Sequence, residues 1–182
     1  PYDQMVRDAR AGNYAPALTV LRQVPENQAT TGQISDHLQI ANWAGLDAEV
    51  VQVYETQGYN RALPVQALTA TARAYRNLKR WDLATQFYNK ALALEPQNPD
   101  LQLGLAMTQA DAGKPDEAVA RARALVAAKP DDPSRRLALA YALTRAGATY
   151  DALFEYDQAF IRAGNKPDIA REYVIALQRA RL

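Results

Sequence analysis

Hydrophobic residues recur along this chain at the three- and four-residue spacing of amphipathic α-helices, and short polar or glycine-containing breaks interrupt them at regular intervals. Residues 65–98 show the unit most clearly, as two such helices joined by a tight turn and followed by a proline stop. A step of 34 residues then lands on the same residue types: Ala84, Ala118 and Ala152 in one series, and Pro96 and Pro130 in another. The pattern predicts an array of helix pairs.

Paired helices at a period near 34 residues are the tetratricopeptide pattern. Many alanines and only 8 glycines in the chain favour helix throughout. We expect an all-α fold, a right-handed superhelical solenoid of about five tetratricopeptide helix pairs plus one extra C-terminal helix, eleven helices in all. A single repeat array should fill residues 1–182, with repeats near 1–30, 31–64, 65–98, 99–132 and 133–166 and a final helix at 167–182. Because the sequence begins with Pro1, we expect a fragment of a longer protein.

Two further features recur in phase with this repeat. Gly45, Gly113 and Gly147 lie where Lys79 lies in its own repeat, and a left-handed residue is expected there because it ends the first helix of each pair. Small residues should allow close helix packing at a second set of positions: Ala72, Ala84, Ala91, Ala106, Ala118, Ala140, Ala152 and Ala159.

Composition excludes several classes of function. With 21 basic and 20 acidic residues, the chain lacks the basic excess that nucleic-acid binding needs, so nucleic acid is not an expected partner. It has no cysteine, which rules out disulfides and thiolate metal sites without choosing between a reducing and an oxidising compartment. No apolar run reaches about 18 residues, so this segment itself is not expected to contact a membrane.

Residues for catalysis are also sparse. His37, the only histidine, falls at a repeat position that is usually apolar, and it is interpreted as a semi-buried structural residue. Asp131 and Asp132 precede Pro133 and are better explained as a loop leading into a helix start than as metal ligands. Glycine-rich phosphate loops, nucleophile elbows and Cys–His pairs are absent from the sequence. We expect no enzyme activity, no cofactor and no metal.

Candidate binding residues lie on the first helix of each pair, which lines the concave face of such a superhelix. Trp43 offers an indole for the apolar face of a sugar, although a tryptophan in a helical repeat also commonly serves packing. Arg73 and Arg76 share a helix face and could clamp a carboxylate, or they could pair with neighbouring acids or remain solvated. The predicted concave-groove residues are Gln39, Asn42, Trp43, Arg73, Arg76, Asn77, Asp111, Tyr141 and Arg145.

More specific likeness is carried by LQIANWAG at residues 38–45, AYRNL at 74–78 and LEPQN at 94–98. In this order and spacing, these segments resemble the periplasmic N-terminal tetratricopeptide region of the PgaA family, outer-membrane porins that export poly-β-1,6-N-acetyl-D-glucosamine (PNAG) for biofilm. The resemblance implies location in the periplasm as part of an outer-membrane protein. It also implies a scaffold that docks the periplasmic polysaccharide deacetylase, guides the partly de-N-acetylated β-1,6-linked N-acetylglucosamine/glucosamine polymer toward the barrel, or does both.

A polymer with free amines is cationic, and of the groove residues only Asp111, with Asp100 nearby, is placed to suit it. This balance favours protein docking over direct polymer binding. The alternative from the fold alone is a general tetratricopeptide adaptor that binds a peptide or protein in its concave groove.

Overall fold

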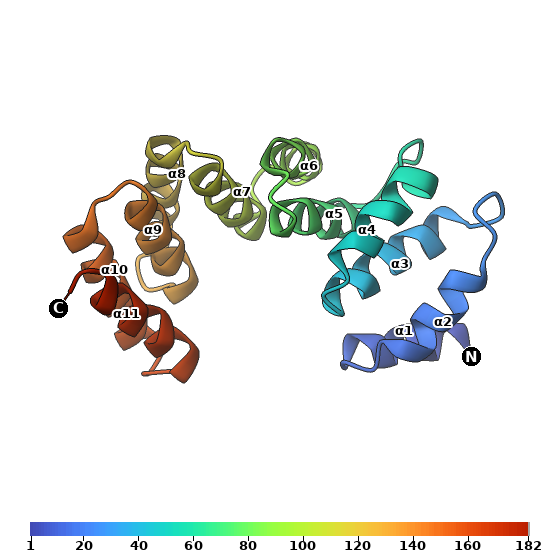
Figure 1. Cartoon of the computed structure of the whole chain (residues 1–182), viewed down its shortest axis with the longest axis horizontal. Coiled ribbons are helices and arrows are strands. Elements are labelled where there is room, and N and C mark those ends of the chain that lie inside the picture. Colours follow the sequence, from blue (N-terminus) through green and yellow to red (C-terminus); the bar gives the residue numbers. More distant parts are fainter. Residues whose placement is uncertain (182) are drawn as a thin grey trace. The chain divides into compact units, whose positions relative to one another are not determined.

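The computed structural model describes residues 1–181, which contain helices and no strand. The chain divides into two compact units, Pro1–Pro96 and the residues from Gln97 onward, each of which is described by itself (Figure 1). Unit 1 contains the helices α1 Tyr2–Arg10, α2 Ala15–Gln23, α3 Thr31–Trp43, α4 Asp47–Val53, η1 Tyr54–Gly58, α5 Val65–Asn77 and α6 Trp81–Leu94. Unit 2 contains α7 Pro99–Asp111, α8 Pro115–Ala128, α9 Pro133–Arg145, α10 Thr149–Arg162 and α11 Pro167–Arg179.

The expected all-α fold is confirmed over the described residues, with five helix pairs and one further helix. In Figure 1 the last helix, α11, lies beside α10, and the two helices pack together. None of the described helices is long and apolar enough to cross a membrane.

Local chemistry explains where the helices begin. The Thr30 side chain accepts from the backbone N–H of Gln33, and the Gln33 side chain accepts from the Thr30 backbone N–H, which closes a capping box on α3. Asp132 caps α9 by accepting from the backbone N–H groups of Ser134 and Arg135, so the interpretation of this aspartate as part of a helix start is confirmed.

Left-handed residues end the first helix of the later pairs, as predicted. The backbone angle φ is +73° at Gly45, +77° at Gly113 and +76° at Gly147. Lys79 adopts φ of +60° at the equivalent position, where a side chain is sterically disfavoured.

One element differs from the sequence prediction. The repeat pattern predicts one continuous α-helix over residues 47–57 as the second helix of the 31–64 unit, but α4 ends at Val53 and the chain continues as the π-helix η1 through Gly58. Gly58 is buried, and a Cβ atom there would lie 3.1 Å from Tyr54 Cδ2 and 3.4 Å from Leu63 Cδ1. The wider turn therefore accommodates close packing that helical periodicity alone does not reveal.

The core of unit 1 combines aliphatic and aromatic side chains. Ile34 and Leu38 of α3 are almost completely buried, as is Tyr75 of α5. The Phe87 ring of α6 packs at 4.7 Å, edge to face, on Tyr54 and at 5.4 Å on Tyr75. These contacts join the second and third helix pairs.

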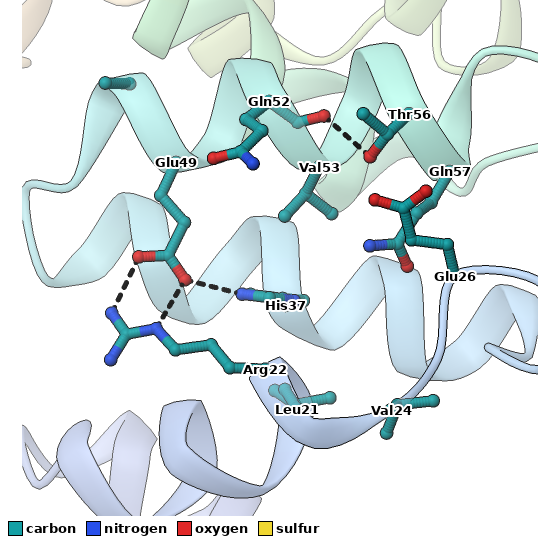
Figure 2. Close-up of a pocket in the computed structure, with 11 residues that line it drawn as sticks. Leu21, Arg22, Val24, Glu26, His37, Glu49, Gln52, Val53, Thr56 and Gln57 are labelled. Carbon is teal, nitrogen blue, oxygen red and sulfur yellow. Dashed lines mark hydrogen bonds and ion pairs between the residues drawn. The ribbon is translucent and has the colours of Figure 1, made fainter.

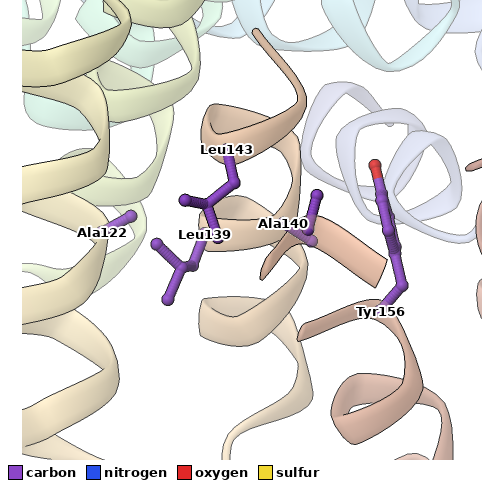
Figure 3. Close-up of a cluster of buried hydrophobic side chains, with 6 residues drawn as sticks. Ala122, Leu139, Ala140, Leu143 and Tyr156 are labelled. Atoms are coloured by element: carbon purple, nitrogen blue, oxygen red, sulfur yellow. The ribbon is translucent and has the colours of Figure 1, made fainter. Parts of the chain in front are cut away.

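In unit 2, Leu139, Ala140 and Leu143 of α9 are buried against Ala122 of α8 and Tyr156 of α10 (Figure 3). All eight alanines that the repeat phase marked as close-packing positions are at most 2% exposed. By contrast Trp81, which the repeat phase predicts in the core because it shares its position with Tyr14, is only half-buried. It occupies the first position of α6, where the solvent reaches the helix end.

Candidate functional site

The predicted residues of α3 lie at its C-terminal end. The Gln39 side-chain amide donates to the Ser35 backbone oxygen at 3.2 Å and to the Ser35 hydroxyl at 3.0 Å, so part of its capacity is used within the helix. Asn42 is half-buried, and Trp43, the last residue of α3, is 38% exposed. Trp43 therefore keeps indole surface available to a ligand, as the carbohydrate hypothesis requires.

The predicted residues of α5 differ in their availability. Arg73 is exposed and Arg76 is half-buried. Burial raises the pKa of the Tyr88 phenol, while the charges of the two arginines act in the opposite direction. Asn77 donates to both carboxylate oxygens of Asp47, at 3.2 and 3.1 Å. Because Arg73 is exposed and Arg76 is half-buried, Arg73 is the more accessible of the two cations. The Asn77–Asp47 bonds link α5 to the start of α4.

The structure brings the three predicted residues of unit 2 together. Tyr141 of α9 donates its hydroxyl proton to Asp111 of α7, and Arg145 binds the same carboxylate oxygen at 2.9 Å. The Arg145 guanidinium also lies 5.4 Å from the Tyr141 ring centre. The Asp111 carboxylate, considered above as an acidic site for a cationic polymer, is thus already engaged by Arg145, although its role in binding stays a prediction.

The predicted site residues therefore divide between the units: those of α3 and α5 lie in unit 1, and Asp111, Tyr141 and Arg145 form a hydrogen-bonded cluster in unit 2. No group of three or more His, Asp or Glu side chains suited to a metal ion occurs among residues 1–181.

Sequence reasoning missed a pocket in unit 1, of about 380 Å³, at the end of α2 and beside α3, α4 and η1 (Figure 2). His37 is 6% exposed, more deeply buried than the semi-buried position expected, and its structural role stays a prediction. Its Nε2 atom lies 2.7 Å from Glu49 Oε1. Arg22 binds the same carboxylate through Nε at 2.9 Å and Nη2 at 2.7 Å. The only signal in the sequence was the isolated histidine, and nothing local indicated its two partners.

The charge state of this network follows from its geometry. The hydrogen bonds from Arg22, followed by those from His37, lower the pKa of the Glu49 carboxyl, although desolvation acts in the opposite direction. Arg22 has its pKa raised in turn by Glu49. Glu49 is therefore a fixed carboxylate on the pocket wall, held by side chains from two other helices.

Comparison with known proteins agrees with the repeat pattern. Residues 75–140 match the tetratricopeptide repeat family. Over 181 residues the chain is 38% identical to the poly-beta-1,6-N-acetyl-D-glucosamine export protein of Escherichia coli strain K12, and equally to that of Escherichia coli O157:H7. The chain is therefore similar to one segment of this export protein, and it has a tetratricopeptide fold. The alignment covers 100% of the chain, which spans only 22% of the length of these relatives.

Solved structures with the same fold are more distant in sequence. A thermophilic tetratricopeptide protein of Thermus thermophilus superimposes with a TM-score of 0.73 at 23% identity, covering 98% of this chain and 97% of that one. MamA of AMB-1 superimposes with a TM-score of 0.73 at 20% identity, covering 91% of this chain and 98% of the other. These similarities support the fold and carry no information on the ligand.

Proposed function

We propose that this chain is a non-catalytic, periplasmic scaffold of a PNAG export protein, which docks the polysaccharide deacetylase, guides the polymer toward the outer membrane, or does both. The observation that carries the proposal is the 38% identity to the export protein along the full length of the chain. Since the relatives are several times longer, the chain contributes one part of the export machinery.

The candidate residues are suited to binding rather than to chemistry. Trp43 exposes part of its indole at the end of α3, next to the half-buried amide of Asn42. An indole face with neighbouring amides matches the apolar face and the acetamido and hydroxyl groups of an amino sugar. Polymer guidance is accordingly assigned to Gln39, Asn42 and Trp43.

An NMR titration with β-1,6-linked N-acetylglucosamine and glucosamine oligomers tests this assignment. The chain has two tryptophans, so the two indole N–H signals can be distinguished by a Trp43→Phe variant. We expect a saturable shift of the Trp43 signal, with the Trp81 signal at the start of α6 as an internal control. If both indoles remain unmoved at millimolar oligomer, polymer guidance through α3 is wrong.

Protein docking is tested separately with the deacetylase. Arg73 is exposed on a first helix, whereas Arg123 is exposed on α8, a second helix. Arg73→Glu should weaken deacetylase capture because a clamp for a partner's carboxylate becomes repulsive, and Arg123→Glu should not. Equal binding by both variants and the original chain, with helical content intact, would exclude Arg73 from the docking surface. A general peptide-binding adaptor is the alternative function, and binding of unrelated peptides with equal affinity would favour it.

A further inference from the structure

The pocket of unit 1 has the dimensions of a small-molecule site. Its volume of about 380 Å³ falls in the range of roughly 300–1,000 Å³ that is typical of ligand pockets. Leu21 and Val53 are buried in its lining, and Val24 and Ala48 extend this apolar surface. None of the eleven residues that line the pocket is Trp, Tyr or Phe, so neither an indole nor a six-membered aromatic ring contributes to recognition there.

Polar groups lie beside this apolar surface, since Glu49 is one helical turn before Val53 on α4 and Arg22 follows Leu21 on α2. Glu49 Oε1 takes bonds from Arg22 and His37, whereas Oε2 takes a bond from Arg22 alone. A carboxylate offers about four acceptor directions, so Oε2 retains capacity for a donor from a ligand. Because Arg22 and His37 hold this carboxylate in place, little conformational entropy would be lost when it binds.

Two amides complete the lining. Gln52 of α4 and Gln57 of η1 both face the pocket, and their side-chain amides make no hydrogen bond within the described part of the chain. Each amide can both donate and accept. The π-helical turn brings Thr56 and Gln57 to the rim together with Glu26 from the loop after α2.

We propose that this pocket binds one N-acetylglucosamine unit of the exported polymer, an inference that rests on the proposed function. The acetamido methyl group would contact Leu21 and Val53, and the acetamido N–H would donate to Glu49 Oε2. The acetyl oxygen and the ring hydroxyls pair with the amides of Gln52 and Gln57. A sugar ring carries several hydroxyl groups and can hydrogen-bond to more of the polar side chains around the pocket than the single backbone amide of a peptide residue can. This favours a sugar over a peptide.

The histidine provides a specific reporter. His37 is the only histidine of the chain and lines this pocket, so its imidazole ring protons give assignable NMR signals from this site alone. Titration of the full chain with a β-1,6-linked N-acetylglucosamine tetrasaccharide should shift these signals saturably. Gln52→Ala and Gln57→Ala should each weaken binding by about fivefold, the usual effect of one lost hydrogen bond. Gln86→Ala, an exposed change on α6 outside the pocket, should leave the affinity unchanged.

Other outcomes overturn the inference in distinguishable ways. If the Trp43 signal shifts and the His37 signals do not, the pocket is not a sugar site but the proposed function stands. If neither residue responds, both the pocket site and polymer guidance by this chain are wrong. Equal shifts of His37 with β-1,6-linked glucose or glucosamine tetrasaccharides would exclude recognition of the acetamido group. An equal shift with N-acetylglycine N-methylamide would show a site for peptide amides instead.

Discussion

Glu49 Oε1 lies 2.7 Å from Nε2 of the buried His37, and the same carboxylate receives two bonds from Arg22. These three residues come from α4, α3 and α2, so the network connects the first two helix pairs of unit 1. Removing the charge should cost stability, since hydrogen bonds to charged groups contribute about 1.5–3 kcal/mol each.

We therefore expect Glu49→Gln to lower the free energy of unfolding by about 1–3 kcal/mol at neutral pH, measured by urea unfolding. The folded state lowers the pKa of Glu49, so its contribution is fully present above the pKa of the unfolded chain, about 4.3, and is lost as the pH falls through the lower folded-state pKa. The difference between the two proteins should narrow below about pH 4. Glu26→Gln, at the exposed rim of the same pocket, is the control and should change little.

Ala118 of α8 is fully buried and packs with Ala110 and Ala142. Ala118→Leu should destabilise the fold by about 1–3 kcal/mol because the added atoms have no space between the helices. Ala120→Leu, on the exposed face of the same helix, supplies the same atoms without the clash. Thermal unfolding by circular dichroism measures both variants, and equal melting temperatures would contradict the packing.

Lys79 has the left-handed conformation that glycine has in neighbouring repeats. Lys79→Gly should raise the free energy of unfolding by about 0.5–1 kcal/mol, since relief of the steric strain exceeds the greater entropy of the unfolded glycine. Gly113→Ala is the reciprocal test: its Cβ would meet no atom within 4 Å, so the expected loss of about 1 kcal/mol comes from the backbone alone. Urea unfolding gives the free energy of unfolding of each variant. A Lys79→Gly variant less stable than the original chain would show that Lys79 is not strained.

The buried Arg136 forms an ion pair at 2.8 Å with the largely buried Glu155, and Arg136 Nε also donates to the Pro130 carbonyl at 2.7 Å. Glu155→Leu alone should cost about 3 kcal/mol because it leaves the arginine buried without its counter-charge. The double change Arg136→Met/Glu155→Leu should cost less than the single one, since a buried apolar pair can replace a buried ion pair. Additive losses in a double-mutant cycle of unfolding free energies would show that the two residues are not coupled.

Much of the fold could be predicted because the relevant signals are local and periodic. Helix spacing, the proline and aspartate helix starts, the left-handed turn residues and the alanine positions each depend on a few neighbouring residues. The candidate site could be predicted only as a set of positions. The sequence did not indicate that Tyr141 and Arg145 bind the Asp111 carboxylate, because they lie 30 and 34 residues from it on another helix.

The sequence by itself determined the helix pairs, their phase and the similarity to a polysaccharide export protein. Repeated residue types specify the pairs and their phase, and direct sequence identity shows the similarity. Only the tertiary structure decided the π-helical turn after Val53 and the pocket around Glu49. The physical reason is that Arg22, His37 and Glu49 lie 12 to 27 residues apart along the chain. Their meeting depends on how three helices pack, which the period of any one helix does not specify.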